Sequence, residues 1–223
     1  MQGLRATGDG AVDHVGRTPR VAAATADARV LTRHRAPERD AVGAGTLIPA
    51  YGQPPALEAL VDEAPAPMVL VVNPANGPGA TADPAFRRVI ERARAREARV
   101  LGYVATTFGA RATTAVEAEV ARYREWYELD GMFVDEVAHD SLRLPYYVGL
   151  RRAIGAGFVV LNPARVPTRG YFALADVVVT YEGPAADYAR RLGLEPSWLR
   201  DVPRDQTAHL VYAATRDDAR SRE

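Results

Sequence analysis

The 223-residue sequence contains no cysteine and no lysine, and residues 1–45 contain no Phe, Tyr or Trp. The absence of cysteine excludes disulfides, thiolate nucleophiles and cysteine-based zinc sites. The 28 arginines are balanced by 28 acidic residues, and this zero formal net charge gives no sign of the basic patch that nucleic-acid binding requires. No segment approaches the roughly 20 apolar residues of a membrane-spanning helix. We therefore expect neither a nucleic-acid partner nor a membrane span.

The two ends of the chain differ from its middle. Residues 1–45 are rich in Arg, Ala, Gly and Asp, so they can bury little apolar area to offset chain entropy. We expect a disordered or loosely ordered tail over 1–45, a frayed polar tail over 216–223, and one folded domain over 46–215. The stretch Met1 to Arg20 has no apolar core, so the sequence as written predicts no signal peptide.

Seven short apolar runs, rich in β-branched residues, recur through the middle of the chain. Runs that are apolar at nearly every position are typical of strands buried on both faces, as in a parallel sheet. The expected strands are Thr46–Tyr51, Met68–Asn73, Val100–Thr106, Met132–Glu136, Phe158–Asn162, Val177–Glu182 and Ala208–Ala213.

Helix-like segments separate these runs. The clearest helix is expected over Pro84–Arg99, where apolar residues recur at helical spacing after a first-turn proline, and others over Thr114–Trp126, Leu142–Ala156 and Ala185–Leu192. The alternation predicts βαβ units with right-handed crossovers. The expected fold is α/β, of the (β/α)8 TIM-barrel type, incomplete with about seven strands because no strand–helix unit follows Ala214.

Carboxylates close two of the expected strands. One strand ends in Asp135 and Glu136, and a later strand ends in Glu182 just before Gly183 and Pro184. Ligands bind at the carboxyl ends of parallel strands, so these acids are candidates for catalysis. Only one of the adjacent pair would ordinarily face the barrel mouth, although both could reach it where the strand frays. Helix capping or surface ion pairing is the alternative role.

Two carboxyl groups facing one sugar-sized site are what glycosidic hydrolysis requires. One protonates the leaving oxygen, and the other attacks the anomeric carbon or activates water. We expect Glu182 to be the general acid/base and Asp135 the nucleophile or transition-state stabiliser, with Glu136 the other candidate for the second role. Burial should raise the pKa of the acid while its partner stays ionised.

Other polar and aromatic residues at or near the strand ends are candidates for substrate binding. Aromatic rings can stack on the C–H face of a sugar, and amides and hydroxyls can bond to sugar hydroxyls. Core packing and local turn hydrogen bonds are the alternative roles, and a lone histidine in a strand is often a bonded core residue. The candidates are Tyr51, Asn73, Tyr103, Thr106, Asn162, Tyr181 and His209.

A metal site would have to draw on Asp135, Glu136, His139 and Asp140. This short cluster lacks an established ligand spacing, so we expect neither a metal nor another cofactor. The segment Asn76-Gly-Pro-Gly79 lacks the Gly-Lys-Ser/Thr ending of a phosphate-binding loop and is expected to be a turn.

Several of these segments, in this order along the chain, resemble the spherulin-4 family (spherulation-specific family 4). They are Leu47–Tyr51, Val71–Gly79, Leu101–Thr106, Trp126–Glu136, Val160–Pro163 and Ala175–Glu182. The resemblance covers about residues 46–214. The chain departs from the family pattern in lacking the final strand–helix unit and the usual tryptophan near Pro54 to Leu57.

The resemblance implies a (β/α)8-barrel glycoside hydrolase, generally extracellular or surface-exposed, that is endo-acting on α-1,4-linked galactosamine-containing polysaccharides. The family's acidic pair falls on Asp135 and Glu136, and its later glutamate on Glu182. The expected partner is then a polysaccharide or oligosaccharide, and the sequence leaves the oligomeric state open. Two other functions stay open: a carbohydrate-binding pseudoenzyme, motivated by the missing unit, and a metal-dependent barrel enzyme.

Overall fold

The computed structural model describes residues 45–213, and the tails expected over 1–45 and 216–223 lie outside this range save for Gly45. Seven strands form one parallel sheet in the order of the chain. They are β1 (Thr46–Ala50), β2 (Met68–Val72), β3 (Arg99–Ala105), β4 (Gly131–Asp135), β5 (Phe158–Leu161), β6 (Val177–Pro184) and β7 (Thr207–Tyr212). All seven expected strands are confirmed, with ends shifted by one or two residues.

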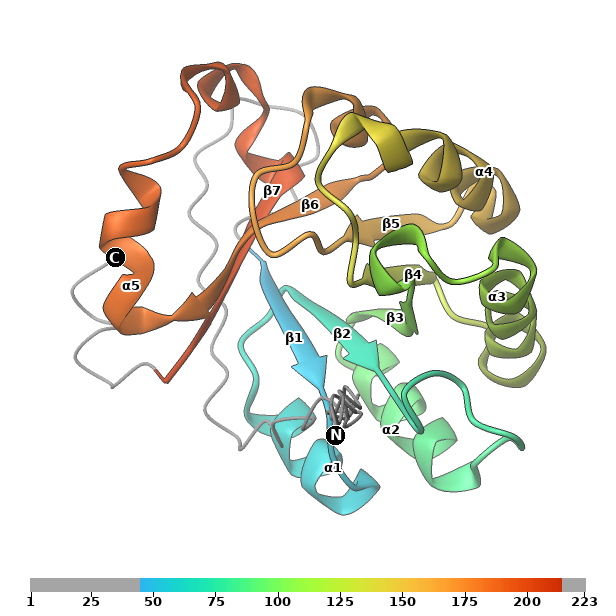
Figure 1. Ribbon diagram of the computed structural model, residues 1–223. Helices are drawn as coiled ribbons and strands as arrows, with labels where there is room; N and C mark the ends of the chain where they lie inside the picture. Colours follow the sequence, from blue (N-terminus) through green and yellow to red (C-terminus); the bar gives the residue numbers. More distant parts are fainter. Residues whose placement is uncertain (1–44, 214–223) are drawn as a thin grey trace, which may run out of the picture.

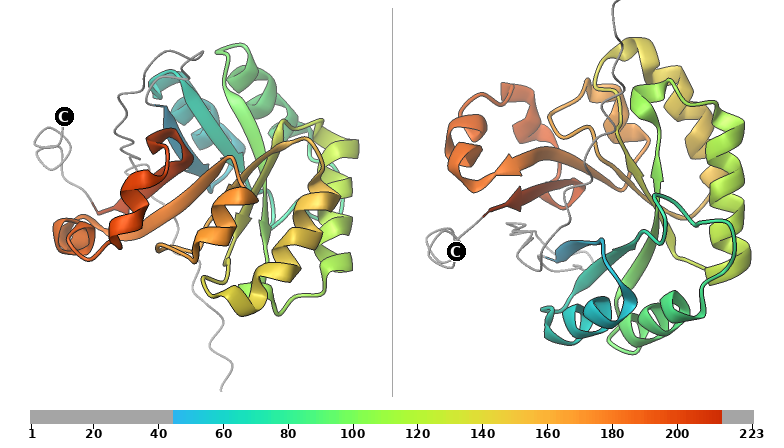
Figure 2. Two further views of the ribbon diagram at one scale, coloured as in Figure 1. Left: turned by 90° about the horizontal axis from the view of Figure 1, so that it is seen from above. Right: turned by 60° about the horizontal axis from the view of Figure 1, so that its bottom comes forward.

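The sheet curls around an interior filled by alternate residues of every strand. One buried cluster takes side chains from all seven, including Leu47 of β1, Phe133 of β4 and Leu210 of β7. The intervening residues, such as Ile48 and Val134, belong to a separate cluster that also contains the helices. Two apolar faces explain why the strand sequences show apolar runs rather than alternation. The curled sheet forms a nearly closed barrel (Figures 1 and 2), although its first and last strands are not paired with each other within residues 45–213.

Helices cover the outside of the curled sheet, as Figures 1 and 2 show. The α-helices are α1 (Pro54–Glu63), α2 (Pro84–Arg94), α3 (Thr113–Tyr127), α4 (Leu144–Ile154) and α5 (Ala185–Leu192). Short 3₁₀ helices lie in the connections: η1 (Thr107–Gly109), η2 (Ser141–Arg143), η3 (Arg169–Ala173), η4 (Ser197–Asp201) and η5 (Arg204–Gln206). The four expected helices are confirmed and α1 is additional. No helix among the described residues has both the length and the apolar character to cross a bilayer.

Close packing between sheet and helices depends on one glycine. Gly102 of β3 lies under the ring of Tyr123 of α3, and a Cβ atom at this position would come within 2.8 Å of ring carbons. The Tyr123 hydroxyl donates to the carbonyl of Val72 in the next strand, 3.2 Å away. The α3 helix is therefore seated directly on β2 and β3, and this seating fixes where the loops after these strands emerge.

Candidate active site

Two carboxylates from different strands meet at the carboxyl end of the sheet. Asp135 is the last residue of β4, and it follows the interior residue Phe133 by two positions, so it faces the interior as well. Its Oδ2 accepts a hydrogen bond from the Tyr103 hydroxyl at 2.8 Å, and its Oδ1 accepts one from Asn162 Nδ2 at 2.8 Å. The carboxylate of Asp135 is thus held on both oxygens.

Asn162 joins this carboxylate to the second one. The same Nδ2 also donates to Glu182 Oε2 at 2.7 Å, and the Asn162 Oδ1 accepts from the amide of Ala164 at 3.0 Å. Laid end to end, the two bonds from Nδ2 limit the distance between Asp135 Oδ1 and Glu182 Oε2 to at most about 5.5 Å. The expected convergence of carboxylates from two strands is therefore present in the structure.

Burial dominates the electrostatics of this pair. Desolvation raises the pKa of Asp135, and the bonds from Tyr103 and Asn162 partly oppose that rise. The pKa of Glu182 is also raised, first by desolvation and then by the charge of Asp135, against the bond from Asn162. As a whole residue Glu182 is exposed, so part of it reaches solvent, while its carboxylate lies among enough protein atoms to be desolvated.

A β-bulge in β6 turns Glu182 toward the interior. Val179 lies opposite Ala208 of β7, and then one extra residue, Thr180, shifts the register so that Glu182 lies opposite Leu210. Ala208 and Leu210 both belong to the interior cluster. In a regular strand, residues three apart face opposite sides, so Glu182 would face the helices if the segment from Val179 to Glu182 ran without the bulge. Bulges commonly re-aim a side chain in this way beside active sites.

Tyr181 and His209 lie on the outer face, away from the two carboxylates. The bulge turns Tyr181 outward, and the regular alternation of β7 does the same for His209, which lies between the interior residues Ala208 and Leu210. Tyr181 and His209 lie opposite each other in the β6–β7 register. The Tyr181 hydroxyl donates to the Pro184 carbonyl at 2.7 Å, and its ring packs against Tyr188 of α5. His209 lies 2.6 Å from the Tyr188 hydroxyl through Nδ1 and 3.0 Å from the Thr180 hydroxyl through Nε2. The assignment of Tyr181 and His209 to substrate binding does not fit this placement, and the alternative of a bonded core residue does.

His209 gives a pH-dependent contribution to stability that can be measured. Burial lowers its pKa from 6.5 to about 4. Between these values the unfolded chain binds a proton on this histidine that the folded chain does not, so the free energy of unfolding should fall as the pH is lowered through that window. The raised pKa values of Asp135 and Glu182 act in the opposite sense.

Comparison with a His209→Gln variant isolates this effect, because glutamine can keep a hydrogen bond to Thr180 and does not titrate. In urea denaturation, the stability of the wild type relative to the variant should drop by about 2 kcal/mol between pH 7 and pH 5. Parallel stability curves for the two proteins over this range would show that His209 titrates as in the unfolded chain.

Glu136 lies beside Asp135 but is held in a different way. Its backbone is left-handed, with φ of 50°. Its Oε2 accepts from the amide of Thr107, 3.1 Å away, and its carbonyl accepts from Phe108 N at 2.7 Å. The side chain is therefore tied to the loop after β3, and the adjacent acids do not share one position.

Two tyrosines stand beside the carboxylate pair. Tyr51, directly after β1, packs edge-on against Tyr103 with ring centroids 5.6 Å apart. Burial and then the charge of Asp135 raise the pKa of both phenols, and Glu182 contributes as well. Among residues 45–213 the Tyr51 hydroxyl makes no hydrogen bond, so it is available to a ligand.

Thr106 is placed differently from what the sequence predicts. It is fully buried, and its hydroxyl donates to the carbonyls of Asp135 and Glu136 at 3.1 Å and 2.8 Å and lies 3.0 Å from the Tyr147 hydroxyl. The assignment of Thr106 to substrate contact does not fit this burial. Its role is to tie the end of β3 to the end of β4.

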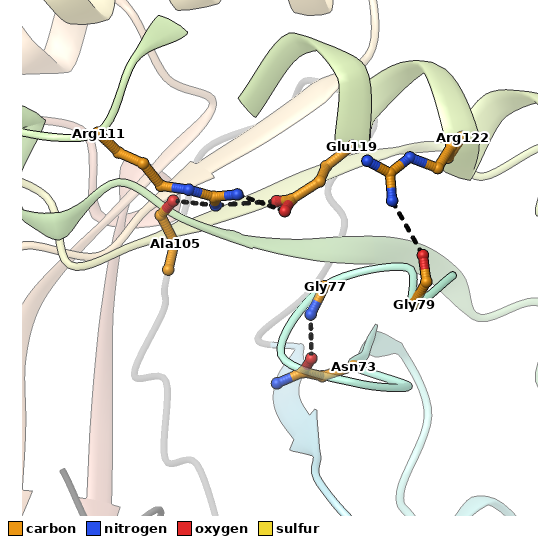
Figure 3. Close-up of polar contacts among 7 residues, drawn as sticks. All are labelled: Asn73, Gly77, Gly79, Ala105, Arg111, Glu119 and Arg122. Carbon is orange, nitrogen blue, oxygen red and sulfur yellow. Dashed lines mark hydrogen bonds and ion pairs between the residues drawn. The ribbon is translucent and has the colours of Figure 1, made fainter. Parts of the chain in front are cut away.

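Asn73 closes its own loop rather than joining the carboxylates. Its Oδ1 accepts from the amide of Gly77 at 2.8 Å, and Arg122 of α3 donates to the carbonyl of Gly79 at 3.0 Å (Figure 3). The expected turn at 76–79 is present, with φ of 140° at Gly77 and 83° at Gly79. For Asn73 the turn-stabilising alternative is the one that the geometry favours.

Sequence reasoning did not find a partly buried ion pair that supports the same end of the sheet. Arg111 donates to Glu119 of α3 through both terminal nitrogens and to the carbonyl of Ala105 at 2.8 Å (Figure 3). A Cβ atom on Gly77 would lie 3.4 Å from the Glu119 carboxyl carbon. The pair therefore fixes the end of β3 and the loop after β2 together. An Arg and a Glu eight positions apart give no signal in a sequence.

The residues of the alternative metal site are not gathered. Asp140 Oδ1 accepts from the amides of Leu142 and Arg143 at the start of η2, and His139 is exposed. Within the described part of the chain, no three His, Asp or Glu side chains stand together as a metal ion would need.

Comparison with known proteins agrees with the arrangement of the strands. The model of spherulation-specific family 4 matches residues 47–223. The chain belongs to spherulation-specific family 4. A curated relative, Spherulin-4 of Physarum polycephalum, is 28% identical over 142 residues, which cover 61% of this chain and 42% of that protein. The match thus spans less than half the length of that family member.

A solved structure shares the barrel architecture of the present chain. It is that of Aspergillus clavatus Sph3 in complex with GalNAc, with a TM-score of 0.58 and 24% identity. The match covers 76% of this chain and 87% of the Sph3 chain. At this level of identity the likeness concerns the fold.

Proposed function

We propose that this chain is a glycoside hydrolase in which Asp135 and Glu182 cleave a glycosidic bond. The observation that carries the proposal is the single amide nitrogen of Asn162 that donates to both carboxylates. Such a bridge fixes two acids from different strands at a spacing suited to one anomeric carbon. Their position at the carboxyl ends of a parallel barrel is where catalytic groups of such folds lie.

The hydrogen bonds support a division of roles. Asp135 accepts two side-chain bonds, from Tyr103 and Asn162, and these favour its ionised form. Glu182 accepts one such bond and lies close to the charge of Asp135, so it retains a proton more readily. We assign Glu182 as the general acid/base and Asp135 as the nucleophile. Glu136 remains the second candidate for the nucleophile.

The shared Asn162 amide keeps one oxygen of each acid within about 5.5 Å of the other, and from this we infer a reaction that retains the anomeric configuration. Retaining enzymes hold their carboxyl groups about 5–5.5 Å apart, and inverting enzymes about 6.5–9.5 Å apart. An oxygen of Asp135 would attack the anomeric carbon while Glu182 gives its proton to the departing oxygen. Glu182 would then take a proton from water, and the water oxygen would displace Asp135 and release the sugar.

The substrate that we propose is an α-1,4-linked chain containing galactosamine or N-acetylgalactosamine, cut internally. Membership of spherulation-specific family 4 and the likeness to Sph3, solved with GalNAc, support this class of sugar. The Tyr51 hydroxyl, close to both carboxylates and without a bond among the described residues, can serve a sugar hydroxyl.

The direct test is to incubate the purified chain with acetylated and deacetylated α-1,4-galactosamine polymers. We expect release of reducing ends, with products of several lengths and an α-anomer formed first in the NMR spectrum. Binding of the polymer without release of reducing ends would instead establish the pseudoenzyme alternative. Activity that a chelator abolishes would establish the metal-dependent one.

Tyr103→Phe tests the charge balance of the pair. Loss of the bond to Asp135 Oδ2 removes an influence that lowers the pKa of that acid. The pKa of Asp135 should rise further, and the acidic limb of the kcat/KM profile should move up by about one pH unit. Tyr51→Phe is the matched control, since Tyr51 makes no bond to Asp135 and the limb should stay in place. Unmoved limbs in both variants would argue against Asp135 as the ionised partner.

A further inference from the structure

An exposed phenylalanine stands at the edge of the carboxylate site. Phe108 lies in η1, directly after β3, and 60% of its surface is exposed. The chain has five phenylalanines, and the other four, Phe86, Phe133, Phe158 and Phe172, are buried or partly buried. Phe108 is thus the one phenylalanine whose ring lies largely in solvent.

The backbone that presents Phe108 is strained. Thr107, Phe108 and Gly109 have φ of 49°, 54° and 76°, so two consecutive residues other than glycine adopt the left-handed conformation. This conformation is unfavourable for residues with a Cβ atom and persists only where the surroundings impose it. Such strain gathers at functional sites because it fixes a side chain that regular backbone would place elsewhere.

The surroundings that impose this conformation are parts of the site. The amide of Phe108 donates to the carbonyl of Glu136 at 2.7 Å, and the amide of Thr107 donates to the Glu136 carboxylate at 3.1 Å. On the other side, Arg143 donates to the carbonyl of Gly109 at 3.3 Å. The ring is therefore carried by a turn that is bonded directly to the residue after Asp135.

The order of the strands sets the ring on one side of the acids. Phe108 follows β3 and Asp135 ends β4, whereas Glu182 comes from β6, beyond β5. A sugar chain bound across Asp135 and Glu182 and continuing toward β3 would pass beside Phe108. The turn that carries the ring is therefore on the side where the sugar next to the cleaved one would lie.

We propose that Phe108 is a binding platform for a second sugar ring of the polysaccharide, in a subsite next to the cleaved bond. The proposal rests on the proposed function. The negative face of the phenyl ring attracts the C–H groups on the flat face of a pyranose, and it also attracts the ammonium group of a deacetylated galactosamine. The strained turn holds the ring ready, so little conformational entropy is lost on binding.

Kinetics on oligosaccharides of increasing length test the platform. Phe108→Ala should lower kcat/KM by about five- to tenfold on a long polymer, through KM, and the loss should shrink as the substrate becomes too short to reach the subsite. Phe108→Trp should restore most of the wild-type value. Leu194→Ala is the control, because Leu194 is 70% exposed and lies between α5 and the amino end of β7.

Affinity electrophoresis in the polymer separates this inference from the proposed function. If the wild type binds without cleaving, the proposed function fails, and weaker binding by Phe108→Ala than by Leu194→Ala still supports the platform. Equal kinetics and binding for Phe108→Ala and the wild type would overturn the platform alone. A loss independent of substrate length would also overturn it. So would a change from dimer to monomer in sedimentation of Phe108→Ala, because the ring would then be a contact between copies of the chain.

Discussion

Glu182→Gln should reduce kcat/KM for polymer cleavage by about a thousandfold or more, because the amide cannot donate a proton to the departing oxygen. Its carbonyl oxygen can still accept the bond from Asn162, and the variant no longer buries an acid whose pKa is raised. Stability should therefore be unchanged or slightly higher. Initial rates of reducing-end release together with thermal unfolding measure both quantities.

The nature of the departing group sharpens this prediction. The fluoride ion of a glycosyl fluoride departs without protonation. The loss of kcat/KM in Glu182→Gln should therefore be much smaller on that substrate than on the polymer. Glu195→Gln is the matched control, since Glu195 also has a pKa raised by burial but lies near His209 on the outer face of β7. Wild-type cleavage of the polymer by Glu182→Gln would remove Glu182 from the mechanism.

The second large effect is expected from Asp135→Asn. Amide nitrogen and oxygen are poor nucleophiles, so kcat should fall by about a thousandfold or more on every substrate, including substrates whose departing group needs no proton. The adjacent acid supplies the control. The side chain of Glu136→Gln can still accept the bond from Thr107 N, and this variant should lose less than about tenfold in kcat.

The comparison of these neighbours decides between the two candidate nucleophiles. In the structure only Asp135 shares the Asn162 amide with Glu182. A larger loss in Glu136→Gln than in Asp135→Asn would reverse the assignment, and circular dichroism of both variants would exclude misfolding as the reason. Trapping with a fluorinated sugar followed by mass spectrometry of the labelled peptide identifies the attacked residue directly.

The architecture of this chain follows closely from its apolar pattern. Strands buried on both faces produce continuous apolar runs, so β4 and β5 were predicted within one residue of their observed ends. The carboxylates were recognisable because each stands at the end of such a run. The additional helix α1 gives a weaker pattern, since it opens with two prolines and buries only a short stripe that includes Leu57 and Val61.

The placement of individual side chains does not follow from the sequence where local geometry departs from regular strands. Tyr181 and His209 are near a strand end in sequence, but the bulge in β6 puts Tyr181 on the face opposite Glu182, and the alternation of β7 puts His209 there. Thr106 ends an expected strand, yet its hydroxyl is hydrogen-bonded to two backbone carbonyls and to the Tyr147 hydroxyl. The bridging role of Asn162 depends on contacts between three strands, and no sequence pattern records such contacts.

The extra residue in β6 also has a consequence for the descent of this chain. The orientation of Glu182 depends on Thr180 standing outside the regular pairing: with two residues between Val179 and Glu182, a regular strand would turn the glutamate to the far side of the sheet. Conservation of the acid alone therefore does not mark an active homologue. An active homologue must also keep either this bulge or a single residue between the two positions, because only these two arrangements aim the carboxylate at the interior.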